Sequence, residues 1–90
     1  MPRFVIERGI PSIGSASQAE LQAIAQKSCA VLRDMPEVQW VHSYVTPDKI
    51  YCVYNAPSAE SVREHAKRGG FPADSVVPVL STIDPTTAEA

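Results

Sequence analysis

The sequence predicts an α+β domain with the element order β-α-β-β-α-β, and three observations carry this prediction. Two runs of β-branched and aromatic residues flank a short Thr46-Pro47-Asp48-Lys49 connection, which is typical of a β-hairpin. A segment with helical periodicity and capping signals stands on each side of the hairpin. Apolar runs at 3–8 and 76–83 add a strand at each end. This order is the split βαβ arrangement called ferredoxin-like, an antiparallel sheet with both helices on one face.

The first strand is expected at 3–8, where aliphatic residues precede a loop at 9–14 that contains two glycines and Pro11. The first helix then begins at Ser17, which forms a capping box with Glu20 three residues later. Its expected buried side repeats at helical spacing and comprises Leu21, Ile24, Ala25, Ser28, Cys29 and Leu32. Residues 34–37, with a proline among them, end this helix.

The hairpin fixes its own cross-strand partners, because a four-residue connection sets the register. The expected pairs are Val45 with Ile50, Tyr44 with Tyr51 and His42 with Val53. One face should then carry Trp40, His42, Tyr44, Tyr51, Val53 and Asn55, and the other Gln39, Val41, Ser43, Val45, Ile50, Cys52 and Tyr54. Both faces are too apolar or aromatic to lie wholly in water, so the helices cover one and something else meets the other.

The second helix should begin after Ser58, a plausible N-cap, and end at Gly69-Gly70. A narrow apolar stripe of Ala59, Val62 and Ala66 marks its buried side. The last strand is expected over 76–80, extending towards Ile83, and Pro78 places it at a sheet edge because proline cannot donate to a ladder. We therefore predict one domain over residues 1–84 and a small polar tail over 85–90.

Alternation along the first strand sends Val5 and Glu7 to the uncovered sheet face, beside the hairpin aromatics. Leaving several aromatic rings in water would cost a few kcal/mol at ~25 cal/mol per Å² of apolar surface. We therefore expect a homodimer of the dimeric α+β barrel type, joined face to face and enclosing a small cavity. The residues expected to line a ligand pocket there are Trp40, Tyr44, Tyr51 and Cys52.

Composition excludes several classes of function. The formal charge of the 90-residue chain is -2 and its pI is near 5.5, so no basic field for nucleic acid is expected. No apolar run approaches the length of a membrane span and no signal-peptide core follows Met1, which favours a soluble, cytoplasmic protein. Cys29 and Cys52 fall in apolar patterns, so both are expected to be buried, reduced thiols.

Candidate chemistry centres on the two histidines. His42 shares the uncovered face with Glu7, and an imidazole near a carboxylate can bind a metal or exchange protons around neutral pH. The alternative is a hydrogen-bonded interface histidine with aromatic packing. His65 lies at the border of the second helix's buried stripe, with Glu64 beside it, but this cluster lacks the spacing of helix-borne metal sites.

Three segments carry a family resemblance: Gln39-Trp40-Val41-His42-Ser43-Tyr44-Val45, Lys49-Ile50-Tyr51-Cys52-Val53-Tyr54-Asn55-Ala56-Pro57 and Val62-Arg63-Glu64-His65-Ala66. In them the chain resembles a family of small bacterial ferredoxin-like proteins, long described as a domain of unknown function, some of whose members bind nickel. The resemblance runs from Phe4 to Pro85. It implies a dimeric α+β fold and makes metal binding the first expectation.

The leading hypothesis is therefore a homodimer that binds a divalent transition ion such as nickel through His65, His42 and an acidic residue, Glu7 or Glu64. Imidazole and carboxylate also suit zinc and copper. A second hypothesis is a small-molecule-binding protein or enzyme that uses the aromatic, histidine-containing cavity, with a histidine as general base. A third is an interaction module whose aromatic face serves only to dimerise.

Overall fold

The predicted order of strands and helices is confirmed in a computed structural model, which describes residues 1–89; the last residue of the predicted 85–90 tail, Ala90, lies outside this range. The elements are β1 (Arg3–Gly9), the 3-10 helix η1 (Ile13–Ser15), α1 (Gln18–Arg33), β2 (Gln39–Val45), β3 (Lys49–Asn55), α2 (Ala59–Gly69), β4 (Ser75–Pro78) and the 3-10 helix η2 (Pro85–Glu89). None of the helices over residues 1–89 is long and apolar enough to cross a membrane.

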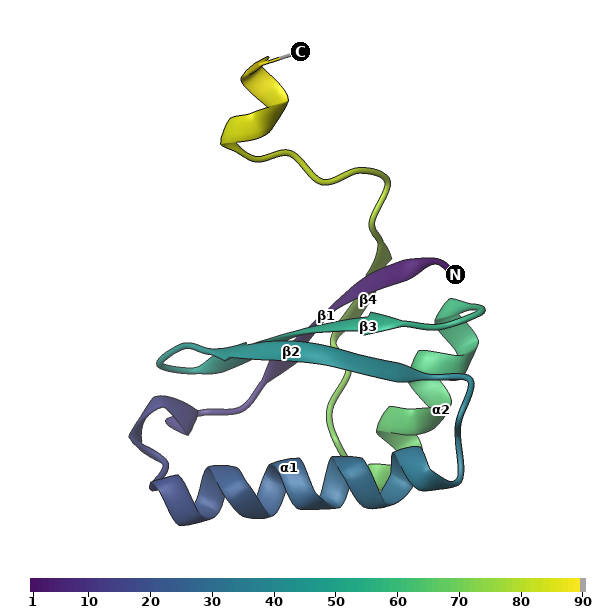
Figure 1. The fold of residues 1–90 in the computed structure, drawn as a ribbon. Coiled ribbons are helices and arrows are strands. Elements are labelled where there is room, and N and C mark those ends of the chain that lie inside the picture. Colours follow the sequence, from purple (N-terminus) through teal and green to yellow (C-terminus); the bar gives the residue numbers. More distant parts are fainter. Residues whose placement is uncertain (90) are drawn as a thin grey trace.

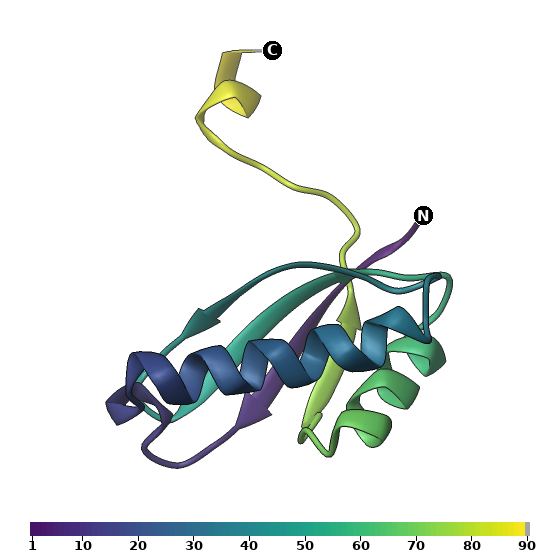
Figure 2. The same cartoon turned by 60° about the horizontal axis from the view of Figure 1, so that its bottom comes forward.

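The four strands form one antiparallel sheet in the order β2-β3-β1-β4. Both helices lie on the same face of this sheet, as Figures 1 and 2 show. The ferredoxin-like prediction is thus confirmed. We call the face under the helices the closed face and the other the open face. β4 is an edge strand, as the proline at its end requires.

Both helices begin where the capping residues predict. The side chain of Ser17 accepts a hydrogen bond from the Glu20 backbone N–H at 3.1 Å, and the Glu20 carboxylate accepts one in return from the Ser17 N–H. Ser58 caps α2 by accepting from the Ser61 N–H. Gly70 ends α2 in the left-handed region, with φ of 71°, where glycine carries no steric penalty.

The hairpin register is as predicted from Val45 to His42 and then shifts by one residue. A β-bulge between Trp40 and His42 adds Val41 to β2 without a partner on β3, so that Trp40 lies opposite Tyr54. The extra residue reverses the alternation of side chains. The expectation that Trp40 shares a face with His42 is therefore wrong, because Trp40 lies on the closed face.

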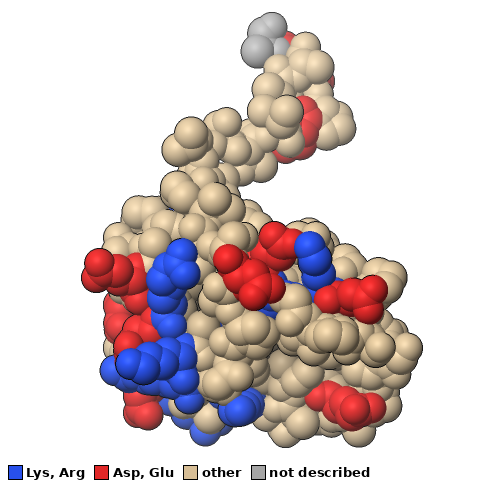
Figure 3. All heavy atoms as spheres, turned by 180° about the vertical axis from the view of Figure 1, so that it is seen from behind, with Lys and Arg blue, Asp and Glu red and all other residues tan. Residues whose placement is uncertain are grey.

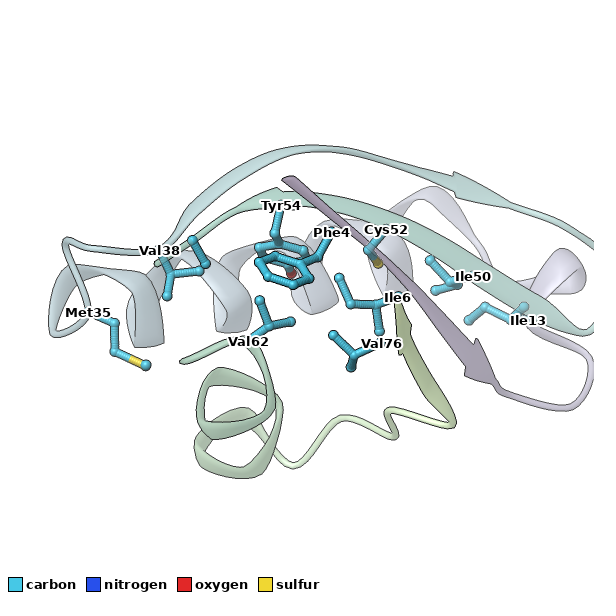
Figure 4. Packing of buried hydrophobic residues seen from close by; sticks show 11 residues of the cluster. Phe4, Ile6, Ile13, Met35, Val38, Ile50, Cys52, Tyr54, Val62 and Val76 are labelled. Carbon is cyan, nitrogen blue, oxygen red and sulfur yellow. The ribbon is translucent and has the colours of Figure 1, made fainter. Parts of the chain in front are cut away.

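The hydrophobic core fills the space between the closed face and the helices (Figure 4). Alternate residues of β1 and β3 point into it and meet Val62 from α2 and Val76 from β4. Ile6, Val62 and His65 are its largest fully buried side chains. The core also takes a charged residue, Arg8, which continues the inward alternation of β1 and is only 3 % exposed.

The two cysteines differ in burial. Both are free thiols, and Cys52 on β3 is buried as expected. Cys29 is exposed, which corrects the expectation that it lies in the core. Successive helix residues are rotated by about 100°, and on α1 the inward position of this turn is taken by Ser28.

The last strand ends earlier than predicted. β4 stops at Pro78, and after one further bond from the Val79 N–H to the Arg3 carbonyl the chain has no strand to pair with, because β1 itself begins at Arg3. Residues 79–89, which we call the C-terminal arm, leave the sheet on the side opposite the helices (Figures 1 and 2). The arm exposes Leu80 and Ile83 by 93 % and 79 %.

Candidate functional site

The open face carries a row of aromatic side chains beside one imidazole. Tyr44 on β2 is 60 % exposed and lies opposite Tyr51 on β3. His42 is also exposed, and its ring meets the Tyr44 ring edge to face at a centroid distance of 4.9 Å. The apolar surface continues over Val77 of β4, which is 53 % exposed. A free imidazole therefore stands on a largely apolar sheet surface.

Glu7 also lies on the open face, but its partner there is not His42. Its carboxylate forms an ion pair with Lys49, the first residue of β3. The hydrogen bond and negative charge of Glu7 raise the pKa of Lys49 above its usual value. In the register, Glu7 lies opposite Tyr51, which lies opposite Tyr44, so one strand separates Glu7 from β2. With strands ~4.8 Å apart, the backbones of Glu7 and His42 are roughly 10 Å or more from each other.

The four predicted metal ligands do not converge within one chain. His42 and Glu7 lie on the open face, whereas His65 and Glu64 belong to α2 on the other side of the sheet. Glu64 is paired with Arg68 at 2.8 Å on the helix surface. Among residues 1–89, no three His, Cys, Asp or Glu side chains are placed to hold one ion.

His65 is enclosed by the core and fully buried. Its Nε2 is 3.2 Å from the Ser28 hydroxyl of α1, and its ring packs against Tyr54 and Phe71. Burial lowers the pKa of His65 below its usual value, an interaction with the Ser28 backbone opposes this, and the positive charge of Arg8 lowers it further. The imidazole is therefore neutral at neutral pH.

Arg8 brings a permanent positive charge into the same region. Its Nε donates to the Cys52 Sγ at 3.4 Å, and one Nη donates to the Pro72 carbonyl at 2.6 Å. The guanidinium also lies 5.9 Å from the centre of the Tyr54 ring and 5.5 Å from that of Phe71. Within residues 1–89 no carboxylate pairs with Arg8, and its second Nη is buried without a hydrogen-bond partner.

A cavity of about 180 Å³ lies between α1 and the closed face. Its wall is mostly apolar, and Arg8 and Ser28 supply polar groups. Of the four residues predicted to line a ligand pocket, Trp40 and Cys52 line this cavity. Tyr44 and Tyr51 lie on the open face, so the predicted pocket is divided between the two sides of the sheet. The bulge turned Trp40 inward, whereas Cys52 lies inward by the regular alternation of β3.

Arg8 and Ser28 were not among the predicted site residues, although the sequence carries a signal for each. Arg8 has the same parity as Phe4 and Ile6 in β1, so alternation alone places it on the closed face. Ser28 lies in the apolar stripe of α1 at the position that faces His65. Arg8 is the stronger signal of the two, because charged side chains are almost never fully buried unless they are paired.

Comparison with known proteins places this geometry in context. Residues 4–79 match a family model described as nickel responsive protein SCO4226-like. Among solved structures, the chain is similar to the crystal structure of SCO4226 from Streptomyces coelicolor A3(2). The two are 28 % identical with a TM-score of 0.76, and the match covers 90 % of this chain and 99 % of that chain. No curated protein matches the chain.

Proposed function

Since the chain belongs to the nickel-responsive SCO4226-like family, we propose that it is a metal-binding homodimer that holds a divalent transition ion such as nickel at its open sheet face. The observation that carries the proposal is the exposed imidazole of His42 on a largely apolar face that also holds the Glu7 carboxylate. Imidazole nitrogen is a preferred ligand of nickel, copper and zinc.

The proposed dimer is supported by the surface that the open face and the arm expose together. Tyr44 and Val77 are both more than half exposed on the open face. The C-terminal arm rises from the sheet on this same side and presents Leu80 and Ile83. Its surface carries few charges, with the acidic side chains of Asp84 and Glu89 and no basic ones (Figure 3). A second copy on the open face would cover the aromatic row and receive the arm.

The ligands that suit this arrangement are His42 and Glu7. Both stand on the open face, and an isologous dimer brings each residue of the face towards the partner copy, so two copies supply twice the donors that one chain places there. His65 is enclosed with its Nε2 bonded to Ser28, and Glu64 pairs with Arg68 on the opposite side of the sheet. Their placement makes them the weaker candidates of the four.

Calorimetric titration of the full chain with nickel chloride at pH 7.5 tests the proposal. The parent should show saturable binding, and His42→Ala should weaken it by roughly tenfold or more, as expected for loss of one ligand. Glu7→Gln should also weaken binding, whereas its matched control, Glu64→Gln, should leave it unchanged. Binding should fall steeply below about pH 6, because a coordinating imidazole must be neutral.

Light scattering on the same samples reports the oligomeric state. A dimer with saturable nickel binding supports the proposal in both parts. A parent protein that binds no nickel at neutral pH, or a His42→Ala variant that binds it as tightly as the parent, overturns the assignment of the metal site. A monomer at micromolar concentration overturns the dimer.

A further inference from the structure

The cavity on the closed face combines an apolar wall with an unbalanced charge. Leu21 and Ile24 of α1 form one side, and Trp40 and Ile50 of the hairpin form the other. Arg8 lines the same cavity from β1. The cavity has a volume of about 180 Å³ and is partly open to solvent, so a small molecule can enter it.

Among residues 1–89, no carboxylate forms an ion pair with Arg8. A guanidinium cannot lose its proton inside a protein, so it remains cationic despite being 3 % exposed. The thiol of Cys52 and the Pro72 carbonyl take two of its donors, and the rings of Tyr54 and Phe71 flank it. The remaining Nη is a buried donor without a partner in the described chain. A buried ion is stabilised when a partner of opposite charge meets it with good hydrogen-bond geometry.

Neighbouring residues hold the side chain of Arg8 in place. Phe71 stacks beside the guanidinium because Gly69 leaves room for its ring: a Cβ at position 69 would collide with the Phe71 ring. Ser28 and His65 close the same region with a hydrogen bond between them. Several elements thus fix the cation at the cavity wall.

We propose that this cavity is a binding site for a small organic carboxylate with an apolar, ring-sized body. The carboxylate pairs with the guanidinium of Arg8, which lines the cavity and whose second Nη has no other partner among residues 1–89. The body lies against Leu21, Ile24 and Trp40. An apolar cavity of ~150 Å³ holds a benzene molecule. At about 180 Å³ this one accommodates a single ring with a short acidic arm and is too small for a nucleotide or a long acyl chain.

Val45 of the hairpin lines the cavity and is 44 % exposed. The site is separate from the proposed metal site, since the sheet stands between them. Binding of a carboxylate therefore does not depend on nickel, and the test is performed with a chelator present.

Trp40 is the only tryptophan of the chain and lines the cavity, so its fluorescence reports occupancy directly. Phenylacetate is the probe, and phenylacetamide, which has the same shape without the charge, is its matched control. Titration of the full chain with phenylacetate should give a saturable change. Phenylacetamide should bind at least roughly tenfold more weakly, since a charge-assisted pair is lost.

Arg8→Met removes the cation while keeping an apolar stem of similar length, and such replacements of buried charge are often neutral for folding. It should abolish the preference for phenylacetate over phenylacetamide, whereas Arg3→Met on the exposed end of β1 should keep it. Ile24→Phe, which fills the cavity without touching the charge, should weaken both probes. The absence of saturable phenylacetate binding to the parent, or an undiminished preference in Arg8→Met, overturns the proposal. If Arg8→Met does not fold, unchanged phenylacetate affinity in Ile24→Phe overturns it.

Discussion

The two faces of the sheet are made by the same strands and yet differ in what completes them. The closed face is covered by both helices and holds nearly all of the buried residues, including Ile6 and Tyr54. The open face exposes Tyr44 and Val77. The helices of the same chain thus cover the closed face, whereas the open face leaves aromatic and apolar side chains exposed in a single chain. In the proposed dimer, each strand would serve folding with one side and association with the other.

The largest effect expected from this contrast is on stability. Ile6→Ala on the closed face removes a fully buried side chain and should lower the free energy of unfolding by about 2–5 kcal/mol. Val5→Ala, its neighbour on the open face, should lower it by less than about 1 kcal/mol, because Val5 is only partly buried in one chain. Urea denaturation at low micromolar protein concentration measures both. Equal losses in the two variants would remove the distinction between the faces.

A second experiment concerns association. Tyr44→Lys places a charge in the centre of the exposed aromatic row, and we expect it to weaken the proposed dimer by roughly a hundredfold, the cost of burying an unpaired charge. Gln26→Lys introduces the same side chain on the exposed side of α1 and should leave dimerisation unchanged. Sedimentation equilibrium measures the dissociation constants. A Tyr44→Lys protein that dimerises as well as the parent would place the interface elsewhere.

The free energy of unfolding should also depend on pH, through a group buried on the closed face. An unfolded histidine titrates near pH ~6.5 and burial holds the pKa of His65 lower in the folded chain, so as pH falls the unfolded state takes up a proton first. Stability is therefore fully present above about pH 6.5 and is lost below it, by up to ~1.4 kcal/mol per pH unit, until the lowered folded pKa is reached.

Urea unfolding at pH 7.5 and 5.5 tests this linkage. The parent and His42→Asn, altered on the open face, should both lose stability between the two values. His65→Asn should lose less, since it has no buried imidazole to protonate. A loss in His65→Asn as large as in the parent would assign the pH dependence to other groups.

The smallest expected effect concerns the C-terminal arm and its contribution to the proposed dimer. A chain that ends at Val79 keeps all four strands and both helices but lacks Leu80 and Ile83. We expect its monomer to unfold at the same urea concentration as the parent, because the exposed arm side chains add little to the core. Its dimer should dissociate several-fold more readily, since apolar surface offered to the partner is lost. A change in monomer stability instead would show that the arm supports its own domain.

The fold was predictable because its signals are local. A capping box, a serine N-cap, a glycine helix stop and a hairpin connection each act over a few residues, and together they leave one arrangement of two helices on a four-stranded sheet. The hairpin register was predictable for the same reason, from Val45 down to His42. The edge position of β4 followed from one proline.

The sites were less predictable because they depend on exceptions to these patterns. The bulge at Val41 has no sequence signature of its own, yet it moved Trp40 from the open to the closed face and divided the expected pocket. Cys29 follows Ser28 on α1, and the spacing of apolar residues did not show that Ser28 is buried and Cys29 exposed. Arg8 was hidden by the general rule that charges stay outside, although the alternation of β1 pointed it inward.

The bulge has a further consequence for how β2 can change over time. Because Val41 is inserted between Trp40 and His42, these two positions have different surroundings: Trp40 lines the cavity and His42 is exposed on the open face. Substitutions at either position can therefore be selected separately. Pairing of Val41 in a regular strand would end this independence, since Trp40 would then share a face with His42 and leave the cavity without its indole wall.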